Sequence, residues 1–99
     1  MYFATAWAAS SFPRGPRSVS YTHLSTWYSS RRVAETYSGY KVLVEEGTDR
    51  ILGAHILGSE ADEVINLFAL AIRSGMRATD LRHMIFAYPT CGSNVTRML

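Results

Sequence analysis

The sequence predicts an α+β fold, in which an antiparallel sheet of three to four strands carries helices packed on one side. Two observations support this fold class. Stretches rich in β-branched and aromatic residues are concentrated between residues 18 and 58, and a long amphipathic helical pattern follows at residues 61–74. Strands that precede the helices, instead of alternating with them, favour antiparallel pairing. The 99 residues suffice for a single domain with one core.

Four stretches have the composition or alternation of strands: residues 18–23, 30–37, 39–45 and 50–58. The strongest pattern is the third, in which Tyr40, Val42 and Val44 share one face. Residues 30–37 form the weakest. Gly47 lies in the polar turn between the last two stretches and is free to adopt a positive φ. We therefore expect these two stretches to be adjacent strands of a hairpin.

The helical pattern at residues 61–74 has an apolar stripe at spacings of four, three and four residues: Ala61, Ile65, Phe68 and Ile72. Three further apolar residues widen the stripe beyond what one sheet face covers: Val64, Leu67 and Leu70. The spacing of Ser59 and Asp62 predicts a capping box at the start, and Gly75 suits the C-terminal end. A short helix at residues 79–84 and one or two final helical turns are expected to follow.

The N-terminal segment, residues 1–17, is expected to be irregular, because it collects Pro13, Pro16, a glycine and two serines. A short helix at residues 4–9 is the alternative for its first part. The apolar start lacks the basic residues of a signal peptide, so we expect a cytoplasmic protein. The domain itself is expected to comprise residues 18–99.

Composition excludes several classes of function. The formal net charge of +2 is too small to indicate nucleic-acid binding, and no apolar run approaches the ~18 residues of a membrane span. The three histidines, His23, His55 and His83, are too far apart in sequence to predict a metal site, and one cysteine, Cys91, cannot form an internal disulfide. Charged residues make up only 18% of the chain, which suggests that a partner covers part of the surface.

Several motifs occur in a specific order along the chain: GYKVLV, a turn, RILGAHILG, EVINLFALAIRSG and finally AYPT. This order closely resembles the C-terminal dimerisation (interface) domain of FAD-dependent pyridine nucleotide-disulfide oxidoreductases. That family includes glutathione reductase, dihydrolipoamide dehydrogenase and mercuric reductase. The resemblance covers about residues 26–99, and its most specific points are residues 51–55 and the pair Pro89 and Thr90.

The resemblance implies a role in assembly. The parent enzymes use FAD and NAD(P)H and form homodimers, and their FAD- and NAD(P)-binding domains are the expected partners if this chain is part of a longer one. The sequence contains neither the Gly-x-Gly-x-x-Gly fingerprint nor paired redox cysteines. We therefore expect a self-association module that holds no cofactor and has no catalysis of its own. A role in cell redox homeostasis would belong to the parent enzyme.

The resemblance also implies site residues. The family's acid/base motif, His-Pro-Thr-x-x-Glu, places Tyr88 at the histidine and Ser93 at the glutamate. Tyrosine titrates near ~10 and cannot shuttle protons at neutral pH as imidazole does. We expect Tyr88, Pro89 and Thr90 to contact the partner subunit's FAD site in a full-length enzyme. We further expect a cis Tyr88–Pro89 bond, an outward Tyr88 and a terminal helix that begins at Thr90; a Tyr88 buried in its own core is the alternative.

Three other functions compete with this interpretation. The first is a small stand-alone binding or assembly module derived from the same family. The second is an autonomous enzyme that uses Tyr88, Thr90 and Cys91, which the absence of a cofactor motif and of a base beside Cys91 disfavours. The third is a binding module that uses the aromatic residues of the N-terminal segment: Tyr2, Phe3, Trp7 and Phe12. A flavin absorption spectrum distinguishes an assembly domain from an enzyme.

Overall fold

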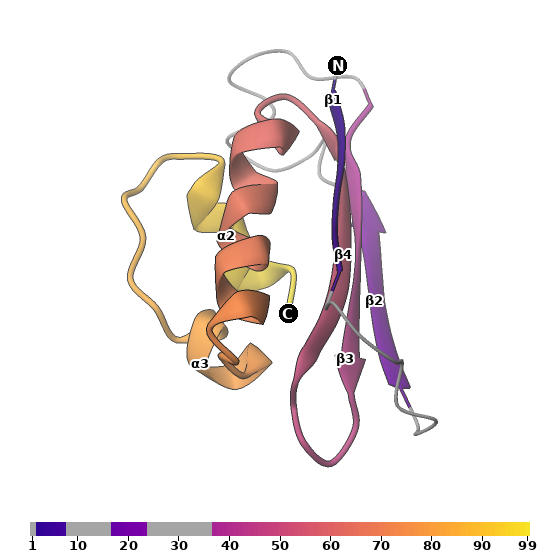
Figure 1. The fold of residues 1–99 in the computed structure, drawn as a ribbon. Helices are drawn as coiled ribbons and strands as arrows, with labels where there is room; N and C mark the ends of the chain where they lie inside the picture. Colours follow the sequence, from indigo (N-terminus) through magenta and orange to yellow (C-terminus); the bar gives the residue numbers. More distant parts are fainter. Residues whose placement is uncertain (1, 8–16, 24–36) are drawn as a thin grey trace.

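The computed structural model describes residues 2–7, 17–23 and 37–99 of the chain. Its elements, in chain order, are β1 (Tyr2–Trp7), β2 (Arg17–His23), β3 (Gly39–Glu45), β4 (Ile51–Gly58), α2 (Ala61–Arg73), α3 (Ala78–Arg82) and the 3-10 helix η1 (Gly92–Arg97). The strands form one antiparallel sheet in the order β1-β4-β3-β2. Helix α2 lies across one face of the sheet, with α3 and η1 on the same side (Figure 1). The predicted α+β class is confirmed.

The hairpin of β3 and β4 is also confirmed. The two strands pair from Gly39 opposite Leu57 to Val44 opposite Ile51. Gly47 adopts φ +88°, as the turn requires. The Glu45 N–H donates to the Arg50 carbonyl at 2.9 Å and closes the turn.

An irregularity between Leu43 and Val44 shifts the register of this hairpin, so that Val44 pairs with Ile51. A bulge of this kind lets Ile51 join the core on the same side as Val42. Val42 is fully buried, and Tyr40 and Val44 pack against the core from the same strand. The predicted common face of Tyr40, Val42 and Val44 is therefore confirmed.

Strand β1 corrects the prediction for the N-terminal segment. Residues 1–17 were expected to be irregular, with a short helix as the alternative, but Tyr2–Trp7 pairs with β4 along six positions, from Tyr2 opposite Gly58 to Trp7 opposite Gly53. Ala6 is 7% exposed and belongs to the core, and Ala4 packs against it. These two small residues therefore let β1 lie close under α2. The pairing also satisfies the backbone hydrogen-bonding groups along the edge of β4.

The predicted strand at residues 18–23 is confirmed as β2, which begins one residue earlier and pairs with β3 from Arg17 opposite Glu45 to His23 opposite Gly39. The weaker strand predicted at residues 30–37 lies outside the described residues except for Tyr37, which is in a bend.

Helix α2 begins and ends close to the predicted positions, but its first cap differs. The N-cap is Glu60, which adopts the left-handed conformation at φ 58° and makes no side-chain cap hydrogen bond, so the predicted capping box is wrong. At the other end Gly75 adopts φ +71°, as predicted. The Gly75 N–H donates to the Ile72 carbonyl and the Met76 N–H to the Ala71 carbonyl. This pair of bonds is a Schellman motif, which satisfies the last carbonyls of the helix.

The core lies between the sheet and the inner side of α2. Phe68 is fully buried at its centre, and Val42, Val95 and Met98 are the other large side chains with almost no exposure. Val95 and Met98 come from η1 and the residue that follows it. The C-terminal segment is thus packed into the same core, which fixes the position of the turn that precedes it.

The turn of the hairpin holds the start of α3. The Asp49 carboxylate oxygen Oδ2 accepts the Thr79 N–H at 2.8 Å, and the Asp49 carbonyl accepts the Ala78 N–H at 2.9 Å. Two N–H groups of the first turn of α3 are therefore satisfied by a residue about thirty positions away in sequence. Hydrogen bonding to Thr79 and, less strongly, the charges of Arg77 and Arg82 lower the pKa of Asp49.

We expect Asp49→Asn to lower the free energy of unfolding by about 0.5 kcal/mol at pH 7. Asparagine tolerates the positive φ of 61° that Asp49 adopts and still accepts a hydrogen bond, but it carries no charge. A carboxyl whose pKa is lowered by folding stabilises above its ordinary value of 3.8, and this contribution disappears as the pH falls through the lowered value. The difference in stability between Asp49→Asn and wild type should thus shrink in urea unfolding experiments as the pH falls below the ordinary value of 3.8. The control is Glu46→Gln, a substitution at an exposed position of the same turn. An effect of Asp49→Asn on stability that does not change with pH would contradict the prediction.

Candidate functional site

Residues 84–91, which we call the C-terminal arm, connect α3 to η1 and stand away from the body of the domain (Figure 1). Three of their large apolar side chains are exposed, whereas Phe86 is half-buried against the core. Ile85 is 99% exposed, Tyr88 75% and Met84 46%. The Tyr88–Pro89 peptide bond is cis, as predicted. The predicted outward position of Tyr88 is confirmed, and the alternative of a buried Tyr88 is wrong.

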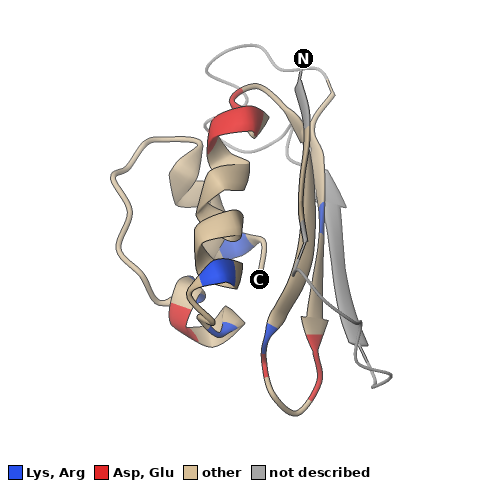
Figure 2. Ribbon diagram, in the orientation of Figure 1, with Lys and Arg blue, Asp and Glu red and all other residues tan. Residues whose placement is uncertain are grey.

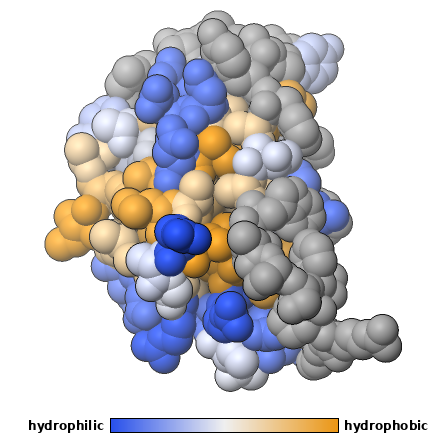
Figure 3. Space-filling view, viewed as in Figure 1, coloured by the Kyte–Doolittle hydropathy of each residue, from blue (hydrophilic) through white to orange (hydrophobic). Residues whose placement is uncertain are grey.

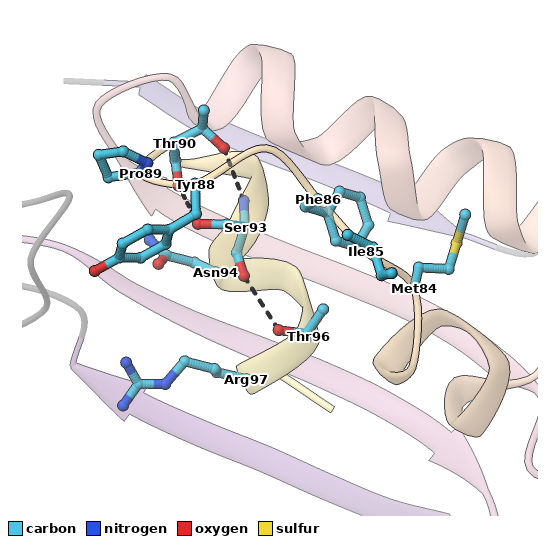
Figure 4. Close-up of a pocket in the computed structure, with 10 residues that line it drawn as sticks. All are labelled: Met84, Ile85, Phe86, Tyr88, Pro89, Thr90, Ser93, Asn94, Thr96 and Arg97. Atoms are coloured by element: carbon cyan, nitrogen blue, oxygen red, sulfur yellow. Dashed lines mark hydrogen bonds between the residues drawn. The ribbon is translucent and has the colours of Figure 1, made fainter.

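Thr90 fastens the arm to η1. Its Oγ1 donates to the Ala87 carbonyl at 2.6 Å and accepts the Ser93 N–H at 3.1 Å. The Ser93 hydroxyl in turn donates to the Thr90 carbonyl at 2.6 Å (Figure 4). The sequence predicted that the terminal helix begins at Thr90, but η1 begins at Gly92. Thr90 instead accepts an N–H of the first turn through its side chain, as a capping residue does.

A pocket of about 340 Å³ lies between the arm and η1. Ile85 and Phe86 line it on the arm side, and Ser93 and Asn94 line it on the η1 side (Figure 4). Arg97 provides the only charge among its lining residues. The pocket thus combines an apolar wall with a wall of hydroxyl and amide groups.

The structure brings the predicted site residues Tyr88, Pro89, Thr90 and Ser93 into this one turn. It does not make an acid/base pair of them, because the Ser93 hydroxyl donates to the backbone of Thr90. These four residues can therefore form hydrogen bonds and van der Waals contacts with a partner. Burial and, secondarily, the charge of Lys41 lower the pKa of His55 in β4.

The outer side of α2 is the second exposed apolar surface. Val64, Ile65 and Phe68 are buried toward the sheet, and Leu67 is half-buried. Leu70 remains 66% exposed. Of the three residues predicted to widen the apolar stripe beyond the sheet, Leu70 is therefore the one that stays exposed. In the view of Figure 3, which sees the two layers from the side, apolar surface extends across the middle of the molecule.

The described residues do not fit a dinucleotide cofactor. The sheet is antiparallel, whereas dinucleotide sites lie at the ends of parallel strands. The long helix begins with Asp62 and Glu63 in its first turn, and their charges would repel a pyrophosphate. In the parts of the chain that the structure describes, no three His, Cys, Asp or Glu side chains gather as a metal site, and no helix is long and apolar enough to cross a membrane.

Fold and surface together define a small two-layer domain that exposes apolar side chains on its helical side. A sequence model of the family described as "Pyridine nucleotide-disulphide oxidoreductase, dimerisation domain" matches residues 15–99. The chain therefore belongs to this family, as the resemblance predicted. The enzymes of the family depend on FAD and NAD(P), and this domain is the part through which they dimerise.

Individual relatives agree with this assignment. A Staphylococcus aureus chain named "Uncharacterized 19.7 kDa protein in mercuric resistance operon" is 46% identical over 81 residues, which cover 82% of this chain and 45% of that protein. Human mitochondrial dihydrolipoyl dehydrogenase is 44% identical over 57 residues, 58% of this chain and 11% of that enzyme.

Solved structures share the fold. The HOCl-induced flavoprotein disulfide reductase RclA from Escherichia coli superposes with a TM-score of 0.81 at 24% identity, over 86% of this chain and 20% of that one. The chain thus spans less than half the length of each of these relatives. Strand β1 lies outside the residues that the family model matches.

Proposed function

We propose that this domain joins two copies of an FAD- and NAD(P)-dependent oxidoreductase of this family through the outer side of α2 and the C-terminal arm. The observation that carries the proposal is the exposure of Leu70, Met84 and Ile85 on the side of the molecule that faces away from the sheet. Aliphatic side chains exposed together on a small, weakly charged domain are typical of a surface that a partner covers. The domain itself performs no catalysis in this proposal, since the chain contains one cysteine and no dinucleotide fingerprint.

In the assembled enzyme, Tyr88, Pro89 and Thr90 of one copy contact the FAD site of the other. The exposure of Tyr88 and the position of the arm away from its own core support this role. Tyr88 stands where the family has histidine, and Ser93 stands where it has glutamate. The pair therefore contributes contact and hydrogen bonding to the partner's site and does not shuttle protons.

A second candidate is a stand-alone assembly module derived from the family. The Staphylococcus aureus relative favours it, because a protein of 19.7 kDa is too small for this domain plus two nucleotide-binding domains of ordinary size. The two candidates differ in their partner. Purification of the chain after co-expression with a flavoprotein of the family distinguishes them, since a stand-alone module is recovered as a dimer of its own copies.

We expect Leu70→Asp and Ile85→Asp each to raise the dissociation constant of self-association at least about tenfold, because each buries a carboxylate in the proposed interface. Sedimentation velocity over a range of concentrations measures this. Leu57→Asp is the matched control, since Leu57 is exposed on β4 between Ile56 and Gly58, both of which are buried. A wild-type chain that stays monomeric at high micromolar concentration, or a control that dissociates as readily as Leu70→Asp, would contradict the proposed interface.

A further inference from the structure

The methionines in the described part of the chain differ sharply in their exposure. Met98 is 1% exposed in the core, and Met76 is half-buried and packs against the core. Met84, the first residue of the C-terminal arm, is 46% exposed. An oxidant dissolved in water therefore reaches the Met84 sulfur more readily than either of the other two.

We propose that Met84 is an oxidation site through which hydroperoxides weaken the self-association of this domain. The lone pair of the Met84 sulfur attacks one peroxide oxygen, the O–O bond breaks, and the proton on the transferred oxygen passes to the leaving oxygen. The thioether is oxidised by two electrons to the sulfoxide, and the hydroperoxide is reduced to water or an alcohol. This inference rests on the self-association proposed above and adds a modification site to it.

Met84 lies where the arm leaves α3. Its N–H donates to the Leu81 carbonyl at 3.3 Å, so the end of α3 holds its backbone in place. Its neighbour Ile85 is 99% exposed. The arm contains no Lys, Arg, Asp or Glu and is therefore drawn entirely in tan in Figure 2. A partner that covers Ile85 thus meets the Met84 thioether within an uncharged surface.

The pocket beside Met84 offers little to a sulfoxide oxygen, which is a hydrogen-bond acceptor. A hydroxyl group has one proton to donate. Three hydroxyl groups that line the pocket already donate theirs to backbone carbonyls, those of Thr90, Ser93 and Thr96. In Figure 4, Asn94 and Arg97 lie at the opposite end of the pocket from Met84. Water satisfies the sulfoxide while the surface is free, but a partner that covers the arm removes that water at a cost in affinity.

Oxidation of Met84 should leave the fold intact. In the described part of the chain, Met84 is not among the residues that form the core or pack against it. The same change at Met98 would place a polar oxygen inside the core. The sulfoxide at Met84 therefore weakens association without lowering stability, and the two effects can be measured separately.

Self-association and oxidation of Met84 oppose each other. A second copy that covers the arm keeps the oxidant from the sulfur, so the sulfoxide forms mainly on the free chain and then hinders its return to the dimer. We therefore expect the rate of Met84 oxidation to fall as the protein concentration rises through the dissociation constant.

Peroxide treatment followed by sedimentation velocity tests the proposal. All chains carry Cys91→Ser, so that the thiol of the arm does not consume the oxidant. After brief exposure to hydrogen peroxide, peptide mass spectrometry should find at least about five times more added oxygen on Met84 than on Met76 or Met98. The dissociation constant should rise at least about fivefold, while the melting temperature stays nearly constant. Methionine sulfoxide reductases for both epimers, supplied with a dithiol, should restore the initial dissociation constant.

Two variants assign the effect to one sulfur atom. Met84→Leu keeps an apolar side chain of similar size but cannot form a sulfoxide. Its dissociation constant, whatever its value, should be the same before and after peroxide. Met76→Leu should respond to peroxide as strongly as the parent chain. Oxidation at any other residue, Met1 included, would affect both variants alike.

The outcomes separate this inference from the function on which it rests. A dimer that survives complete oxidation of Met84, or a Met84→Leu chain that still dissociates on oxidation, overturns the Met84 site and leaves self-association intact. Equal oxidation of the three methionines, or a rate at Met84 that does not depend on protein concentration, does the same. An untreated chain that is monomeric at every concentration overturns both. If Met84→Leu fails to fold, the reductase treatment decides, because it needs no variant at this position.

Discussion

Phe68→Ala is expected to lower the free energy of unfolding by about 3–5 kcal/mol, the range found for removing a fully buried aromatic side chain. Phe68 has no exposed surface and lies at the centre of α2, between the sheet and the C-terminal segment. Other buried residues of the same core belong to different elements: Val42 to β3, Ala54 to β4 and Val95 to η1. They cannot all move inward to fill the cavity, so the loss should be near the upper end of the range.

Urea unfolding monitored by circular dichroism measures the Phe68→Ala effect. The control is Leu70→Ala, two positions along the same helix but exposed, which should change stability by less than about 0.5 kcal/mol. Because domains of this size have only about 5–15 kcal/mol of stability, Phe68→Ala is expected to retain a small part of it or none. A loss below about 1.5 kcal/mol would show that the core is not centred on this residue.

Deleting residues 1–16 should lower the stability of the domain as much as Phe68→Ala does, or more, although it leaves almost all of the family-matched sequence in place. The deletion removes β1, uncovers the hydrogen-bonding edge of β4 and exposes Ala54 and Ile56 from that side. An exposed edge strand of this length is also a site of aggregation. We expect the truncated chain to show no cooperative thermal unfolding or to precipitate.

Two point variants distinguish the strand itself from the rest of the deleted segment. Ala6→Asp places a carboxylate at a buried position under α2 and is expected to cost more than about 3 kcal/mol. Thr5→Asp makes a similar change at the neighbouring exposed position and should cost little. A truncated chain that melts within a few degrees of the intact one would mean that β1 is not part of the folding unit.

The hairpin of β3 and β4 and the length of α2 were predictable because their signals are local. Alternating apolar residues, a glycine in the turn and a glycine after the helix each act within a few positions. The N-terminal cap of α2 was not predicted correctly, since Ser59 and Asp62 have the spacing of a capping box, yet Glu60 takes the N-cap position.

Strand β1 was missed for a different reason. Its composition, with Tyr2, Phe3, Thr5 and Trp7, is typical of strands, but it stands next to a segment containing Pro13 and Pro16. Whether such a short stretch becomes a strand depends on a free edge elsewhere in the chain. That edge is provided by β4, more than forty positions away in sequence.

The candidate site also has features that the sequence predicted and features that it did not. The exposed Tyr88 and the cis bond before Pro89 were both predicted. The cis bond followed from the aromatic residue before proline together with the family resemblance, and the exposure of Tyr88 followed from the resemblance. The role of Thr90 in fastening the arm was not predicted, because its two hydrogen bonds depend on the path of the backbone on either side. The contact of Asp49 with α3 is invisible in the sequence for the same reason.

The anchors at the two ends of the C-terminal arm have a consequence for the entropy of association. One end leaves α3, which Asp49 holds against the hairpin turn, and the other enters η1, where Val95 is buried and the Tyr40 hydroxyl donates to the Arg97 carbonyl at 3.4 Å. Exposed loops usually lose backbone freedom when a partner orders them, at a cost that subtracts from affinity. An arm anchored at both ends has already lost much of that freedom during folding, so a second copy meets Ile85 and Tyr88 in a largely preorganised arrangement.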